Sequence, residues 1–106
     1  MRVLFDQGTP VPLRALLVAH DVTTLSELGW SELQNGELLR QAEEAGFEVF
    51  VTTDQNLKYQ QNLPGRSLAI AVLMAASWPR LERNCASVIA KIDALSSGDY
   101  VEISIP

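Results

Sequence analysis

Hydrophobic positions along the chain follow two periods in turn, and this alternation is its most informative feature. Short apolar runs, several rich in β-branched residues, predict strands at residues 2–5, 21–25, 47–51, 68–76 and 99–105. In the last run Tyr100 and Glu102 alternate with Val101 and Ile103, which predicts an edge strand with one solvated face.

Helical spacing fills the intervals between these strands. Leu13, Leu16 and Leu17 recur at i, i+3 and i+4, and Leu38, Leu39 and Ala42 form one face of a second helix, for which Gly46 is a suitable C-terminal stop. The run from Pro79 to Leu95 has the same spacing and predicts one long helix, after which Gly98 provides a stop.

Strands that alternate with helices predict an α/β fold in which helices cover both faces of a mostly parallel sheet. We therefore expect a three-layer α/β/α sandwich. A length of 106 residues suits a single domain over residues 1–106, with one core.

Composition limits the cellular compartments and the kinds of binding partner that suit this chain. The net charge is −5, which excludes a generally basic nucleic-acid surface. Cys85 is the single cysteine, so it makes no disulfide within the chain and suits a reducing compartment. The N-terminus has no apolar signal segment, and the longest apolar run is too short to span a membrane. These features indicate a cytoplasmic protein that does not insert into a membrane.

Polar residues follow the predicted strands, where open α/β sheets bind their ligands. Asp6 follows the first strand, and Asp54 follows the third within the stretch VFVTTDQN. Glu37 falls in the first turn of the middle helix. The simplest interpretation is structural, because an Asp after a strand commonly caps the next helix and a first-turn Glu favours the helix dipole.

A phosphate-accepting receiver domain is one functional interpretation of Asp54. Receivers carry two adjacent acids after the first strand and a Lys at the end of the fifth. Here Gln7 and Gly8 follow Asp6, and the last strand, which ends in EISIP, has no Lys. Since those residues handle the phosphate and its metal, this chemistry is disfavoured.

A metal-dependent nuclease is the alternative. Asp6, Glu37 and Asp54 supply three carboxylates, and Asn56 is a candidate neutral oxygen ligand. Such hard oxygen ligands suit Mg²⁺ or Mn²⁺, which would assist hydrolysis of a phosphodiester.

The layout LFDQGTPVPLRALL, then NGELLRQAEEAGFEVFVTTDQNL, resembles the PIN-like domains, in particular small bacterial members described as toxin ribonucleases. The resemblance covers essentially the whole chain, through short motifs. It implies a sheet order of 3-2-1-4-5 with the last strand at an edge.

Residue by residue, the resemblance implies that Asp6 matches the first PIN aspartate, that Asp54 matches the strand-end aspartate and that Glu37 is the candidate for the middle acid. Thr52 matches the motif's Thr and would orient the Asp54 carboxylate. Asn56 stands where many PIN domains place a fourth acid, and Gln7 and Gly8 replace the usual Glu and Asn.

The candidate ligands predict a Mg²⁺- or Mn²⁺-dependent nuclease, and the resemblance implies that it is a ribonuclease, in the role of a toxin that pairs with an antitoxin protein. Arg14, Lys58 and Arg66 are the candidate phosphate contacts, with a solvated loop as the plain alternative for 56–66. The competing hypothesis is a catalytically degenerate PIN-like scaffold that acts in protein–protein contact, including as a homodimer.

Overall fold

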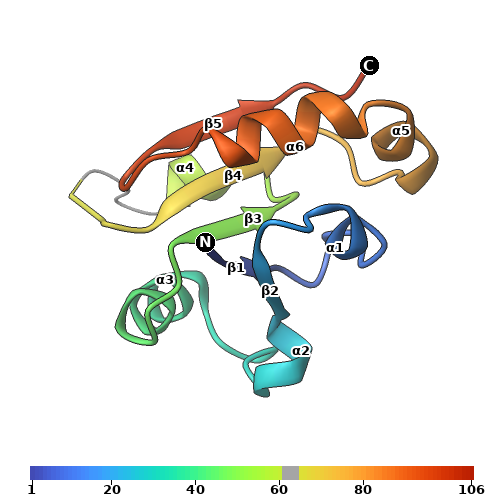
Figure 1. Ribbon diagram of the computed structural model, residues 1–106. Coiled ribbons are helices and arrows are strands. Elements are labelled where there is room, and N and C mark those ends of the chain that lie inside the picture. The colour runs from blue at the N-terminus through green and yellow to red at the C-terminus, as the bar shows by residue number, and fades with distance from the viewer. Residues whose placement is uncertain (61–64) are drawn as a thin grey trace.

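A computed structural model describes residues 1–60 and 65–106 of the chain (Figure 1). Within these residues one five-stranded sheet has the order β2-β1-β3-β4-β5, and all four strand pairs are parallel. The strands are β1 (Arg2–Phe5), β2 (Asp21–Thr24), β3 (Val49–Thr52), β4 (Ala69–Leu73) and β5 (Tyr100–Ile103).

Helices cover both faces of this sheet, which confirms the predicted α/β/α sandwich. The described helices are α1 (Leu13–Leu16), α2 (Leu25–Leu28), α3 (Asn35–Glu44), α4 (Leu57–Gln60), α5 (Trp78–Arg83) and α6 (Cys85–Asp93). Apolar residues of α1, α5 and α6 pack on one face, while those of α2, α3 and α4 pack on the other.

Successive residues of the central strands supply the two cores, because side chains along a strand point to opposite faces. Val49 and Val51 of β3 enter the α1/α5/α6 core, and Phe50 between them enters the α2/α3/α4 core. All residues of β3 and β4 are buried, as the continuous apolar runs predicted for strands covered on both sides.

The strand order differs from the predicted 3-2-1-4-5. β3 pairs directly with β1, in the register Val3↔Val49 to Phe5↔Val51, and β2 occupies the edge. Burial gives the reason. β2 has one buried residue of four and an exposed Asp21, whereas β3 is buried throughout. The more apolar strand therefore lies inside the sheet. The expected edge position of β5 is confirmed.

The predicted long helix at 79–95 is also wrong as a single element. It is divided into α5 and α6 at Asn84, whose backbone leaves helical geometry (φ −110°, ψ 14°) and whose side chain donates to the Arg80 carbonyl. Asn competes for backbone groups in this way, which makes it a poor helix-interior residue.

The short helix α2 was not predicted, although the sequence carries its signal. Thr24 and Glu27 form a capping box, in which each side chain accepts a hydrogen bond from the backbone N–H of the other.

In the described ranges, no helix has both the length and the apolar character that a membrane span requires.

Candidate functional site

The sheet order places a switch point between β1 and β3. From β1 the chain crosses to β2 on one side, and β3 then lies on the other side of β1. Ligands of open α/β sheets bind outside the carboxyl ends of the strands at such a point. Asp6 leaves β1 there with its N–H donating to the Val51 carbonyl of β3 (3.0 Å), so the residues that follow both strands meet.

A buried hydroxyl joins the two strand ends. Thr52 has no exposed surface, and its Oγ1 donates to Asp6 Oδ2 at 2.7 Å. The same oxygen accepts the backbone N–H of Asp54 at 3.0 Å. Thr52 was expected to orient the Asp54 carboxylate. It instead orients the Asp6 carboxylate and the Asp54 backbone, so one side chain holds both aspartates in place.

The Asp54 carboxylate lies between two asparagines. Oδ1 accepts the backbone N–H of Asn56 at 3.0 Å, in a turn that leads into α4. The structural interpretation expected Asp54 to cap the next helix, whereas the recorded bond goes to Asn56, which precedes the first residue of α4. Oδ2 lies 3.5 Å from the side-chain nitrogen of Asn35, the first residue of α3.

Asn35 was missed by the sequence interpretation. The stretch QNGELL places Asn35 and Glu37 two positions apart at the start of α3. Residues two apart do not share a helix face, so only one of them can face Asp54. That a polar side chain would come from this turn was predictable, but its identity depended on where the helix begins.

Neutral groups supply the hydrogen bonds that the structure records for the two aspartates. Asp6 Oδ1 accepts the N–H of Gln7 at 2.7 Å, in addition to the Thr52 bond on Oδ2. Among the ion pairs of the described residues, none involves Asp6 or Asp54. Each carboxylate oxygen retains acceptor capacity, because an ionised carboxylate has about four lone-pair sites.

The donor set therefore fits a hard cation in part. Mg²⁺ prefers oxygen ligands and is often held by one or two carboxylates together with water and substrate phosphates. In the part of the chain that the structure describes, no three His, Cys, Asp or Glu side chains converge as a metal-binding group. The site resembles a two-carboxylate site, not a complete cage.

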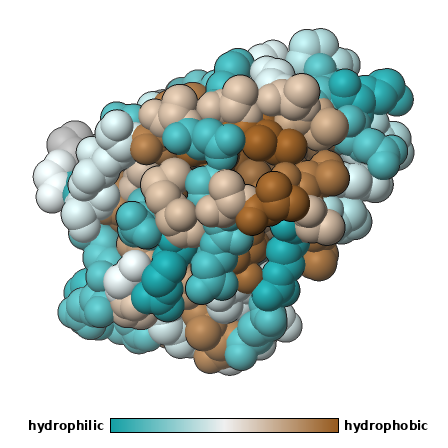
Figure 2. Space-filling model, in the orientation of Figure 1, coloured by the Kyte–Doolittle hydropathy of each residue, from teal (hydrophilic) through white to brown (hydrophobic). Residues whose placement is uncertain are grey.

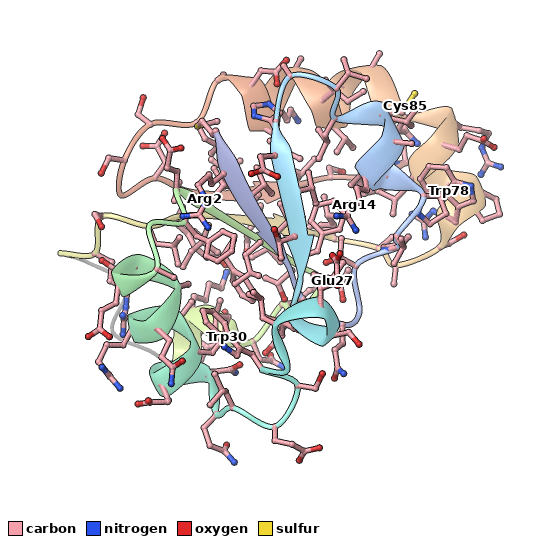
Figure 3. The ribbon with its side chains drawn as sticks, turned by 60° about the horizontal axis from the view of Figure 1, so that its bottom comes forward. Arg2, Arg14, Glu27, Trp30, Trp78 and Cys85 are labelled. Carbon is pink, nitrogen blue, oxygen red and sulfur yellow. The ribbon has the colours of Figure 1, made fainter. Side chains whose placement is uncertain are left out.

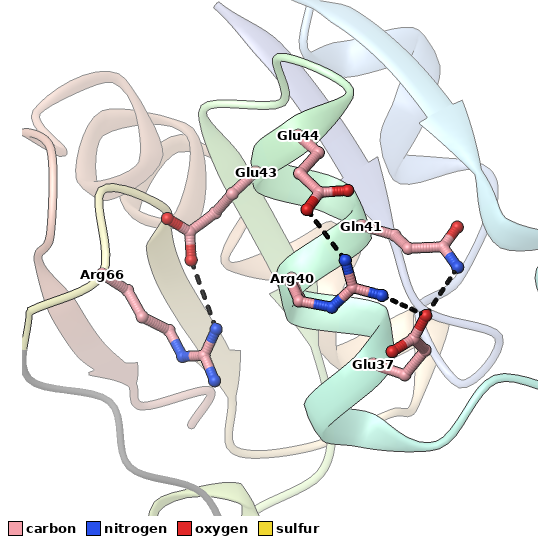
Figure 4. A network of polar contacts seen from close by, with 6 residues as sticks. All are labelled: Glu37, Arg40, Gln41, Glu43, Glu44 and Arg66. Carbon is pink, nitrogen blue, oxygen red and sulfur yellow. Dashed lines mark hydrogen bonds and ion pairs between the residues drawn. The ribbon is translucent and has the colours of Figure 1, made fainter.

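Glu37, the predicted third ligand, is engaged on the surface of α3 (Figure 4). Its Oε1 accepts hydrogen bonds from Arg40 and from Gln41, the latter at 2.9 Å, and Arg40 also pairs with Glu44 at 2.8 Å. The hydrogen bond from Arg40, followed by that from Gln41, lowers the pKa of Glu37. No recorded contact within 1–60 and 65–106 joins Glu37 to Asp6 or Asp54.

The three predicted phosphate-binding cations all have acidic partners. Arg14 forms a two-bond pair with Glu27, at 2.8 and 3.3 Å (Figure 3). Lys58 pairs with Glu102 of β5 at 2.9 Å, and Arg66 pairs with Glu43 at 3.3 Å.

The pKa directions agree with this pairing. The pKa of Lys58 is raised chiefly by its hydrogen bond to Glu102. The pKa of Glu27 is lowered first by the Thr24 backbone N–H and then by Arg14. Much of the positive charge assigned to substrate binding is therefore offset within the chain.

An open cleft of about 210 Å³ adjoins Asp6 on its β2 side. One wall is the β1–α1 loop, with Gln7, Thr9 and Val11, and the other is the start of α2, with Leu25 and Ser26. Asp6 is thus shared between the switch-point cluster and this cleft.

Comparison with known proteins gave no match for this chain among family models, curated proteins or solved structures. The resemblance to PIN-like domains thus stays a prediction that rests on the short motifs and on the residues described above.

Proposed function

We propose that this protein is a Mg²⁺- or Mn²⁺-dependent ribonuclease of the PIN-like kind, with Asp6 and Asp54 as the carboxylates that hold the ion. The observation that carries the proposal is the pair of aspartates at the switch point, tied together by buried Thr52 without a basic partner in the described structure. Two negative charges at neighbouring strand ends, with neutral recorded partners, favour the binding of a cation.

The chain's own residues would supply positioning. Thr52 fixes the Asp6 carboxylate, and the Asn56 N–H and Asn35 amide fix the Asp54 carboxylate. The Asn56 side-chain oxygen is the candidate neutral ligand of our proposal. When bound, a divalent ion of this type offsets charge on a phosphodiester and activates water.

RNA affinity should be modest. The net charge is −5, and Arg14, Lys58 and Arg66 are paired with acids. Neutralisation of phosphates by Lys and Arg provides most sequence-independent affinity for nucleic acid. A cytoplasmic toxin with an antitoxin partner is the biological role that the resemblance implies, and a partner would compensate for weak RNA binding.

The deciding experiment is cleavage of an end-labelled single-stranded RNA with Mn²⁺, Mg²⁺ or EDTA. We expect cleavage that requires metal and falls by at least ~100-fold in Asp6→Asn and Asp54→Asn, the order of loss when a charge-stabilising group leaves an active site. Asp21→Asn is the matched control, because Asp21 is exposed at the opposite, amino-terminal end of β2.

All variants should first show the circular dichroism of the wild-type fold. A wild-type protein that leaves RNA intact with both metals would refute the proposal. Equal cleavage by wild type and Asp54→Asn would also refute it.

A second function, as a scaffold for protein contact, is favoured by an apolar surface on α1 and the adjoining part of α6 (Figure 2). Val18, just after α1, is 89% exposed. We take a second copy of the chain as the partner, since such a patch can meet its own equivalent across a two-fold axis. Sedimentation should then show a dimer that Val18→Asp dissociates, and a wild-type monomer at high concentration would refute this.

A further inference from the structure

The cleft beside Asp6 has walls of two kinds. Val11, 57% exposed, and buried Leu25 present apolar surface, while Gln7 and Ser26 present polar side chains. The volume of about 210 Å³ is smaller than the ~300–1,000 Å³ typical of pockets for drug-sized ligands. The cleft therefore suits a single small ring system and not a long stretch of polymer.

Some of the polar groups in the cleft are already engaged. The Thr9 hydroxyl donates to the Val51 carbonyl at 3.0 Å. The Thr24 hydroxyl interacts with Glu27 as part of the α2 capping box. These two threonines stabilise the cleft walls and are poorly placed to bind a ligand.

Gln7 and Ser26 differ from the threonines. Both residues are exposed, and within 1–60 and 65–106 the structure records no hydrogen bond for the Gln7 amide or the Ser26 hydroxyl. An exposed amide offers an acceptor oxygen and a donor nitrogen side by side. The edge of adenine presents the complementary pattern, with the N6 amino group as donor and N7 as acceptor.

The cleft also lacks a cation of its own. No Lys or Arg lines it, and nearby Arg14 is paired with Glu27. A phosphate would find no positive side chain there, whereas an uncharged base would meet apolar walls and an amide.

We propose that this cleft is a subsite for an adenine base, with Gln7 as the residue that reads it. The inference rests on the proposed function, in which the phosphate beside that base is the one cleaved at Asp6 and Asp54. The subsite makes cleavage selective for adenine. It also gives the Gln7 amide, next to Asp6, a role in substrate recognition.

The test is a titration of the whole protein with 5′-AMP and with 5′-CMP in the presence of Mg²⁺, followed by backbone amide NMR. AMP should shift the signals of Gln7, Val11 and Ser26 to saturation and bind at least about fivefold more tightly than CMP, the lower bound of a bidentate amide–adenine pair. Gln7→Ala should remove this preference. Gln7→Glu should reverse it toward CMP, because a carboxylate accepts from the cytosine amino group.

A matched pair of variants tests the location. Val11→Asp introduces a charge at the cleft and should weaken AMP binding several-fold. Ala45→Asp introduces the same charge at an exposed position just after α3, outside the cleft, and should leave AMP binding unchanged. Equal affinity for the two nucleotides, a preference that survives Gln7→Ala, or AMP shifts that map elsewhere would each overturn the subsite.

The two proposals fail separately. AMP bound in the cleft by a protein that leaves RNA intact would remove the nuclease and retain the adenine site. Metal-dependent RNA cleavage that is equal at A and C, and unchanged by Gln7→Ala, would overturn the subsite and retain the nuclease.

Discussion

Two groups of acidic side chains in this protein have opposite surroundings. Asp6 and Asp54 lie at the switch point, where a fully buried threonine, two asparagines and backbone N–H groups hold them. Glu37 and Glu44 lie on the exposed face of α3, where Arg40 pairs with both.

The difference concerns charge more than hydrogen bonding. Both groups accept several hydrogen bonds, but the α3 acids are neutralised by a guanidinium. The recorded partners of the switch-point acids are neutral. Carboxylates at neighbouring strand ends without a fixed cation are the basis of the ion site that we propose. The sequence alone made Glu37 as good a candidate ligand as Asp6 and Asp54. The hydrogen-bond and ion-pair partners in the structure distinguish Glu37 from the two aspartates.

Metal binding should give the largest effect. In calorimetric titration with Mn²⁺, we expect Asp6→Asn and Asp54→Asn each to weaken binding by at least ~100-fold, because each removes a hard charged ligand. Glu37→Gln should leave the affinity unchanged, since Arg40 already compensates its charge.

The comparison fails if Glu37→Gln weakens Mn²⁺ binding as much as the aspartate variants do. It also fails if the wild-type protein releases no heat with Mn²⁺. Thermal unfolding with and without the ion provides a second readout, because an ion that binds only the folded state raises Tm.

Removal of the Thr52 hydroxyl should have an intermediate effect. Thr52→Val keeps the shape of the side chain but leaves the Asp54 N–H and Asp6 Oδ2 each without a recorded partner. We expect the free energy of unfolding to fall by about 1–3 kcal/mol, the cost of unsatisfied buried polar groups. Urea unfolding monitored by fluorescence measures it.

Thr23→Val on β2 is the matched control. Thr23 is half-buried, and the structure records no hydrogen bond for its side chain within the described ranges. Its substitution should change stability by less than ~0.5 kcal/mol, as for most sites away from special features. A Thr52→Val protein as stable as Thr23→Val would show that the hydroxyl does not tie the two strand ends together.

Loss of Arg40 should have the smallest effect on stability and a clear effect on titration. In Arg40→Gln the pKa of Glu37 should rise toward its ordinary value of 4.5, because the Arg40 hydrogen bond is the largest cause of its lowering. Carboxyl-carbon NMR across acidic pH measures this shift, and an unchanged Glu37 pKa would contradict the pairing.

The sign of the pH dependence follows from the same shift. The pKa of Glu37 is lower in the folded protein than in the unfolded chain, so its pair with Arg40 contributes to stability above pH 4.5. That contribution is lost as the pH falls through the folded pKa.

Arg83→Gln is the control for Arg40→Gln. It removes an exposed arginine from the end of α5 and should leave the Glu37 titration unchanged.

The fold class was predictable because hydrophobic periodicity is a local signal. The apolar patterns predicted the strand at 2–5 with its observed bounds, and the strand predicted at 47–51 is observed at 49–52. The strand order was not predicted correctly. Which of β2 and β3 lies inside the sheet depends on competition between these strands for burial. Comparison of DVTT with VFVT would have favoured β3 inside.

The positions of two residues of the candidate site were predictable, and the surroundings of the third were not. Asp6 and Asp54 follow strand ends, and strand ends of a parallel sheet share one edge. The role of Glu37 was harder, because it depends on the helical phase at which α3 begins and on Arg40 three residues later. A sequence shows that an acid is near a helix start, but the register of that helix decides what the acid faces.

The Thr52–Asp6 contact also determines when, during synthesis and folding of the chain, the site can form. It joins residues 46 positions apart, across strands that pair only after β3 has been made. Parallel pairing between distant segments is slow compared with helix or hairpin formation. A nascent chain can therefore complete β1 and β2 well before Thr52 reaches the Asp6 carboxylate. Insertion of β3 beside β1 brings Thr52 to Asp6, and it is therefore the earliest step at which the proposed ion site can form.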